Sequence, residues 1–234
     1  MRLQKNHWLY YKPIAHRGLF NENILENSIP AYKRAIDFGY AIEIDVYSSI
    51  DGELFCFHDK TLDRMTGKCG NIFDKTSKEI KKLHLKNTTE KIPTLKEVLS
   101  LCENKTPLLI EIKNQPRKDI VEKVVNTLKS YSGEFAIQSF NPFYIKKVKK
   151  LAPSFIRGIL ASKTPDTNKK LERFVVKRMP FNFLAKPDFI SIEYTSLPIK
   201  TKLLTLAWTV TSQQTLNEIK PYINNIIFEN FLPE

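Results

Sequence analysis

Two histidines and several carboxylates lie within predicted strands or directly after them. His16 and His58 each follow a short stretch with strand character. Glu43 and Asp45 stand two residues apart within 41–47, so their side chains share one face of that predicted strand. A histidine gives or takes a proton near neutral pH, and carboxylate oxygens suit hard divalent cations. These residue types predict metal-assisted acid–base cleavage of a phosphoester.

A second pair repeats this spacing at the end of the predicted strand 107–112. Glu111 and Lys113 again stand two residues apart. With Glu111 there are three carboxylates, which form a ligand set suited to Ca²⁺ or Mg²⁺. Three negative charges held close together would be energetically costly without a compensating cation. Arg17 and Lys113 could neutralise the oxygens of a bound phosphate. An isolated Glu-x-Asp would more simply be an ion-paired strand end, but the combined set favours a metal site.

The elements that must position these residues alternate along the whole chain. The strand-like stretches are 13–15, 41–47, 107–112, 135–138, 156–160, 189–192, 206–210 and 225–228. The helical stretches are 29–38, 77–83, 94–102, 117–130, 142–151, 168–178 and 213–219. Such alternation predicts an α/β fold with parallel strands, a (β/α)₈ TIM-type barrel in one domain, 1–234. A doubly wound open sheet is the alternative, but no glycine-rich phosphate loop follows an early strand.

One further strand-like stretch, 54–57, is not among the strands of the predicted barrel. Residues 54–57 follow a tight turn at Gly52 and end at His58. Residues 59–93 then form the longest connection, a short insertion before the next strand. In a barrel of this type the working residues lie at the carboxyl ends of the strands.

Composition restricts the classes of protein and partner. The 234 residues carry a net charge of +12 and are 42% hydrophobic, as in a globular domain that meets anionic partners. No aromatic and basic pattern typical of RNA recognition accompanies that charge, so we expect no nucleic acid partner. Weak peripheral contact with an anionic membrane is compatible with it. We expect a cytoplasmic protein, because its three cysteines form no CxxC pair and the sequence shows no signal peptide and no long apolar run.

Taken in order, the motifs resemble those of a known family. They are His16-Arg17-Gly18, Glu26-Asn27-Ser28, Glu43-x-Asp45-Val46, His58-Asp59-x-Thr61-Leu62-Asp63-Arg64, Ile92-Pro93-Thr94-Leu95, Glu111-x-Lys113, Gln138-Ser139-Phe140 and Trp208-Thr209-Val210. Together they resemble the glycerophosphodiester phosphodiesterase family, in particular its short, cytosolic bacterial-type members. The resemblance covers almost the whole chain.

The resemblance implies an activity and a role for each matching residue. The expected reaction is hydrolysis of glycerophosphodiesters, deacylated phospholipid head groups, to glycerol 3-phosphate and an alcohol. The implied roles are His16 and His58 as the acid–base pair, Glu43, Asp45 and Glu111 as ligands of a divalent cation, Arg17 and Lys113 as phosphate contacts, Trp208 at the pocket wall, and Glu26 and Gln138 as supporting residues. The other two histidines, His7 and His84, are expected to have no catalytic role.

The sequence departs from the family pattern after the last strand. Where the family usually has Thr-Asp-x-Pro, this chain has Glu229-Asn230. A lysophospholipase D acting through the same site remains an alternative, and a non-catalytic anion- or nucleic-acid-binding barrel a remote one. The sequence does not determine which alcohol is preferred, which metal is used or which histidine is the acid and which the base. It also does not determine whether a cyclic phosphate intermediate forms, or the oligomeric state.

Overall fold

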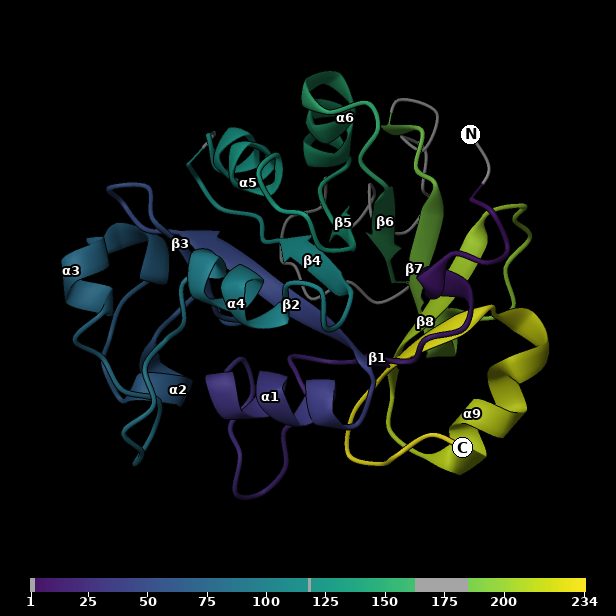
Figure 1. Cartoon of the computed structure of the whole chain (residues 1–234), viewed down its shortest axis with the longest axis horizontal. Helices are drawn as coiled ribbons and strands as arrows, with labels where there is room; N and C mark the ends of the chain where they lie inside the picture. Colours follow the sequence, from purple (N-terminus) through teal and green to yellow (C-terminus); the bar gives the residue numbers. More distant parts are fainter. Residues whose placement is uncertain (1–2, 118, 163–184) are drawn as a thin grey trace. The chain divides into compact units, whose positions relative to one another are not determined.

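A computed structural model describes residues 3–117, 119–162 and 185–234 (Figure 1). Contacts divide the chain into two units, Arg17–Phe135 and the pair of segments Met1–His16 and Ala136–Glu234. The predicted helix 168–178 lies outside the described residues.

Three buried strands form the sheet of the Arg17–Phe135 unit. They are β2 (Ala41–Ser48), β3 (Leu54–Cys56) and β4 (Leu108–Ile112). Strands β2 and β4 run parallel with Asp45 opposite Glu111, while β3 folds back antiparallel with Cys56 opposite Val46. Every residue of the three strands is buried, the acidic Glu43, Asp45 and Glu111 as well as the apolar ones. The parallel register therefore brings the carboxylates of two strands next to each other.

The described part of this unit has three longer helices, and capping side chains start two of them. They are α1 (Ile29–Asp37), α4 (Leu95–Cys102) and α5 (Ile120–Leu128). The Ser28 hydroxyl accepts the N–H of Ala31 at the start of α1, and Thr94 forms a capping box with Glu97 at the start of α4. Both helices match their predicted ranges to within one residue. Helix α5 is shorter than the predicted 117–130.

Residues 59–93 form the short insertion expected after His58. It contains α2 (Asp63–Thr66), the 3₁₀ turn η2 (Ile72–Asp74) and α3 (Ser77–Ile80). Its apolar side chains pack with those of the β2–β3 hairpin in one buried cluster, which includes Tyr47, Phe55, Phe57, Leu62, Met65, Ile72 and Ile80. The helix predicted at 77–83 is only one turn long, although a capping box of Thr76 and Glu79 starts it.

Six strands form the sheet of the other unit, in the order β1-β9-β8-β7-β6-β5. They are β1 (Ile14–Ala15), β5 (Phe135–Ser139), β6 (Arg157–Ala161), β7 (Phe189–Glu193), β8 (Leu204–Val210) and β9 (Asn225–Phe228). All of these neighbours pair in parallel. The helices are α6 (Pro142–Leu151) and α9 (Gln213–Ile219), with 3₁₀ turns η1 (Trp8–Tyr10), η3 (Tyr194–Ser196) and η4 (Lys220–Tyr222). Both helices have their predicted bounds.

The fold class is the predicted (β/α)₈ TIM-type barrel. In the described part of the chain β3 is the one antiparallel strand, because it belongs to the hairpin at Gly52 rather than to the βα alternation. No helix within residues 3–117, 119–162 and 185–234 has both the length and the apolar character needed to cross a membrane.

Candidate active site

Three carboxylates meet where the parallel strands β2 and β4 pair side by side. Glu43, Asp45 and Glu111 each offer an oxygen, and these oxygens lie within 4.8 Å of one another. The residues are only 1%, 1% and 7% exposed. The cause is local: Glu43 and Asp45 share a face of β2, and the register places Glu111 opposite Asp45. The structure thus brings together the three predicted metal ligands.

Glu43 shows how unfavourable this cluster is without a cation. Burial raises the pKa of Glu43 well above its usual range, and the charges of Asp45 and Glu111 raise it further. Its Oε2 accepts the backbone N–H of Arg17 at 3.1 Å, but its buried Oε1 has no hydrogen-bond partner in the described part of the chain. A set of three carboxylates with an orphaned buried oxygen fits a hard divalent cation.

Lys113 partly offsets this negative charge. Its Nζ lies 3.1 Å from Oδ1 of Asp45 and 3.0 Å from Oε1 of Glu111. Burial lowers the pKa of Lys113, but the two carboxylates outweigh burial, so the pKa lies above its usual value. The ammonium therefore stays charged beside the proposed metal ligands.

The His16-Arg17-Gly18 and Glu26-Asn27-Ser28 motifs hold the backbone and side chains around the cluster. Arg17 has a φ of +55°, unusual for a residue with a side chain, and this conformation accompanies its N–H bond to Glu43. At Gly18, φ is +82° and a Cβ would lie 2.9 Å from Ala31, so the motif requires glycine there. Asn27 Nδ2 donates to Oδ2 of Asp45 at 3.1 Å. The sequence placed Asn27 in a motif but did not reveal this bond.

A chain of ion pairs leads from Arg17 to His58. Arg17 Nη1 lies 2.9 Å from Oε1 of Glu26, and Arg64 Nη2 lies 2.6 Å from the same oxygen. Arg64 Nε also lies 2.6 Å from Oδ2 of Asp59, whose Oδ1 is 2.8 Å from His58 Nδ1. Although burial acts in the opposite direction, these hydrogen bonds hold the pKa of Asp59 well below its usual range. Glu26 and Asp59 are therefore ionised supports of Arg17 and His58.

In the other unit His16 has a carboxylate partner of its own. Ala15 pairs with Phe228 in the parallel β1–β9 ladder, so the next residue on each strand, His16 and Glu229, also come together. Nδ1 of His16 lies 2.7 Å from Oε2 of Glu229. Glu229 was noted in the sequence only as a departure from the family pattern.

Trp208 and Gln138 also belong to this unit. Trp208 lies on β8 in edge-to-face contact with Phe140, with ring centroids 5.6 Å apart. Gln138 is 1% exposed, and its Oε1 accepts a hydrogen bond from Ser191 at 2.7 Å. Gln138 thus links β5 to β7 inside the unit.

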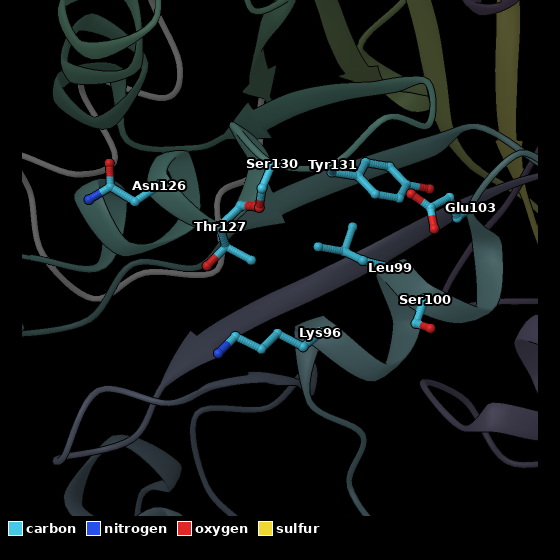
Figure 2. Close-up of a pocket in the computed structure, with 8 residues that line it drawn as sticks. All are labelled: Lys96, Leu99, Ser100, Glu103, Asn126, Thr127, Ser130 and Tyr131. Atoms are coloured by element: carbon cyan, nitrogen blue, oxygen red, sulfur yellow. The ribbon is translucent and has the colours of Figure 1, made fainter.

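A groove between α4 and α5 contains none of these residues (Figure 2). It measures about 540 Å³ and is lined by Lys96, Leu99, Ser100, Glu103, Asn126, Thr127, Ser130 and Tyr131. Its side chains come from helices and their ends, not from the carboxyl ends of strands. This groove is therefore separate from the candidate site.

Comparison with known proteins points to one family. Residues 16–231 match the family described as "Glycerophosphoryl diester phosphodiesterase family". A glycerophosphodiester phosphodiesterase of Caldanaerobacter subterraneus is 42% identical over 159 residues, which cover 63% of this chain and 65% of that protein. The match thus spans just under two thirds of that relative's length.

Solved structures share the fold over most of the chain. A glycerophosphodiester phosphodiesterase from Parabacteroides distasonis has a TM-score of 0.76 at 26% identity, covering 93% of this chain and 92% of that one. A phosphodiesterase from Oleispira antarctica, solved in complex with the product sn-glycerol-3-phosphate, has a TM-score of 0.76 at 23% identity with the same coverage.

Proposed function

Because the chain belongs to the glycerophosphoryl diester phosphodiesterase family, a family of phosphoric diester hydrolases, we propose that it hydrolyses glycerophosphodiesters to glycerol 3-phosphate and an alcohol. The observation that carries this proposal is the buried cluster of Glu43, Asp45 and Glu111, with Lys113 beside it. The glycerol 3-phosphate named as the product of the Oleispira antarctica phosphodiesterase supports the choice of product.

The acidic cluster would hold one divalent cation, Ca²⁺ or Mg²⁺. Glu43 Oε1 supports this assignment, since it is a buried acceptor that the described residues leave without a donor. When bound, the cation supplies Lewis acidity at a phosphoryl oxygen.

Two cationic side chains would bind the substrate phosphate in this proposal. Glu26 already orders the Arg17 side chain, so binding a phosphate costs the guanidinium little further conformational entropy. Lys113 would add a point charge beside the metal ligands. Both charges oppose the negative charge that develops on the phosphoryl group in the transition state.

His16 and His58 would be the proton-transfer pair. Each has Nδ1 beside a carboxylate, at 2.7 Å for Glu229 and 2.8 Å for Asp59. A carboxylate acceptor keeps the hydrogen on Nδ1, so Nε2 is the nitrogen that exchanges a proton with the substrate. One histidine would accept the proton of the attacking oxygen, and the other would give a proton to the leaving alcohol.

The remaining assignments follow from the sequence. Trp208 would form part of the pocket wall, with Glu26 and Gln138 as supporting residues. The partner would be a small-molecule diester rather than a nucleic acid, with at most weak contact with an anionic membrane. A cytoplasmic location and a single domain spanning 1–234 also remain proposals.

The test is hydrolysis of a panel of deacylated phospholipid diesters. Purified protein is incubated with glycerophosphocholine, glycerophosphoethanolamine or glycerophosphoglycerol and with Mg²⁺ or Ca²⁺, and glycerol 3-phosphate is measured by an enzyme-coupled assay. We expect release of glycerol 3-phosphate that depends on the metal. Intact diesters with every cation would refute the proposal.

Histidine variants test the assigned roles. His16→Ala and His58→Ala should each lower kcat by about 100-fold or more, the usual contribution of a positioned general acid or base. His84→Ala is the matched control and should retain the wild-type rate. Near-normal turnover in either site variant would remove that histidine from the mechanism. Lysophosphatidylcholine in a parallel assay distinguishes a lysophospholipase D.

A further inference from the structure

The strongest unassigned feature is a basic hollow in the unit that contains β5–β9. It measures about 880 Å³, within the size range of small-molecule sites. The charged residues that line it are Lys5, Lys149, Arg157, Lys186, Lys202 and Asp188. Five positive side chains thus face one negative one around a single concavity. A hollow with this imbalance attracts anions.

Arg157 gives the hollow a fixed positive charge. The residue is 6% exposed, and Nη1 donates to the carbonyl oxygens of Pro153 and Phe155 at 3.2 and 3.0 Å. Its Nε is buried without a hydrogen-bond partner among the residues described. Neutral carbonyls orient a guanidinium but leave its charge largely uncompensated. The side chain is therefore held in place without being neutralised.

Asp188 compensates only part of this charge. Its Oδ2 lies 3.9 Å from Arg157 Nη1, beyond direct hydrogen-bond distance, and accepts the backbone N–H of Arg157 at 3.1 Å. The positive charges also repel one another. Burial lowers the pKa of Lys149, and repulsion from Lys186 and Arg157 lowers it further. An anion bound among these groups would relieve the repulsion.

The hollow lies at the amino ends of the strands. Arg157 begins β6, Asp188 immediately precedes β7, and Leu204, another lining residue, begins β8. Trp208, assigned to the pocket wall, lies near the other end of β8, about 13 Å away at 3.3 Å per residue. The hollow is thus separate from the proposed catalytic groups of this unit.

We propose that the basic hollow binds a phosphate group, carried by a small phosphate ester or by a lipid headgroup. Several point charges around an oriented guanidinium suit a phosphate with negative charge on several oxygens. The side chains of Lys5, Lys186 and Lys202 are exposed, so the site can be reached from solvent. Nothing in the proposed hydrolysis uses these residues.

Equilibrium dialysis with inorganic phosphate at low ionic strength tests the site. The variant Lys149→Gln/Lys202→Gln removes two of the five charges, and Lys146→Gln/Lys220→Gln removes two lysines of the same unit that do not line the hollow. We expect the first variant to lose one phosphate equivalent relative to wild type, or to bind it at least tenfold more weakly. The control should bind as wild type does.

The comparison with wild type separates this site from the catalytic one. If the catalytic centre also binds phosphate, the number of phosphates bound per chain falls from two in wild type to one in Lys149→Gln/Lys202→Gln. If the catalytic centre binds none, that number falls from one to zero. Diester hydrolysis by Lys149→Gln/Lys202→Gln should be unchanged in either case. Arg157→Gln, checked for its melting temperature, should show the same loss of phosphate binding.

Vesicles distinguish the source of the phosphate. Sedimentation with phosphatidylcholine vesicles is compared with and without phosphatidylglycerol, for wild type and both double variants. A lipid headgroup predicts that wild type and the control sediment with the anionic vesicles, while Lys149→Gln/Lys202→Gln does not. A free phosphate ester predicts a difference in dialysis alone. If Lys149→Gln/Lys202→Gln behaves as wild type does in both assays, the proposal is wrong.

Discussion

Nδ1 of His16 lies 2.7 Å from Oε2 of Glu229, the residue that follows β9. The two residues are 213 positions apart, yet the parallel pairing of β1 with β9 brings them together. A carboxylate on Nδ1 fixes both the tautomer and the orientation of an imidazole ring. Glu229 is therefore a candidate positioning residue for His16.

Glu229→Gln should lower kcat by about tenfold or more with little change in KM, because the amide no longer enforces the required tautomer. Glu229→Asp should recover part of the rate. Steady-state kinetics on a glycerophosphodiester measures both, with Glu218→Gln as an exposed control. Equal kcat for Glu229→Gln and wild type would show that the contact has no role in turnover.

Asp59→Asn should remove a pH-dependent part of the stability. A carboxyl whose folded pKa lies below its unfolded value of about 3.9 stabilises the protein above that pH and loses this effect as the pH falls. We expect a melting temperature about 3 °C below wild type near neutral pH, and a difference that shrinks below about pH 4. Thermal melts across this range, with Asp37→Asn as the exposed control, check the prediction. A difference that does not vary with pH would contradict it.

Lys113→Met should destabilise the metal-free protein by about 3 kcal/mol, because it leaves Asp45 and Glu111 buried without their shared cation. Urea denaturation in the presence of a chelator measures this loss. Added Ca²⁺ or Mg²⁺ should restore more stability to the variant than to wild type. An unchanged urea midpoint would mean that the cluster does not need the ammonium.

Glu43→Gln should weaken stabilisation by the metal without unfolding the chain. Glutamine keeps the shape of Glu43 but removes one of three charged ligands, so the affinity for a divalent cation should fall about 100-fold. Thermal shift with increasing Ca²⁺ or Mg²⁺ tests this, with Glu22→Gln as a surface control. A metal response equal to wild type would exclude Glu43 as a ligand.

The sequence predicted the features that depend on local periodicity. The i, i+2 spacing of Glu43 and Asp45 specifies a shared face, and the βα alternation specifies parallel strands, so the acidic cluster follows from both. The capping residues Ser28 and Thr94 likewise lie where the predicted helices 29–38 and 94–102 begin.

What depended on distant contacts was missed. The partner of His16 required the register of β1 with β9, which no local pattern encodes. The bond from Asn27 to Asp45 needed the left-handed backbone at Asn27, with a φ of +50°. The helix at 77–83 was predicted too long, because apolar side chains there join the buried cluster of the insertion and the chain turns after Ile80.

Lys113 also bears on what happens when divalent cations are scarce. With its ammonium already between Asp45 and Glu111, the chain carries its own counterion for part of the acidic cluster. Under the proposed function, a fall in metal supply would stop turnover before it unfolds the chain, because the ammonium still offsets part of the charge that the metal would bind. Resupply would then restart diester breakdown without new protein synthesis.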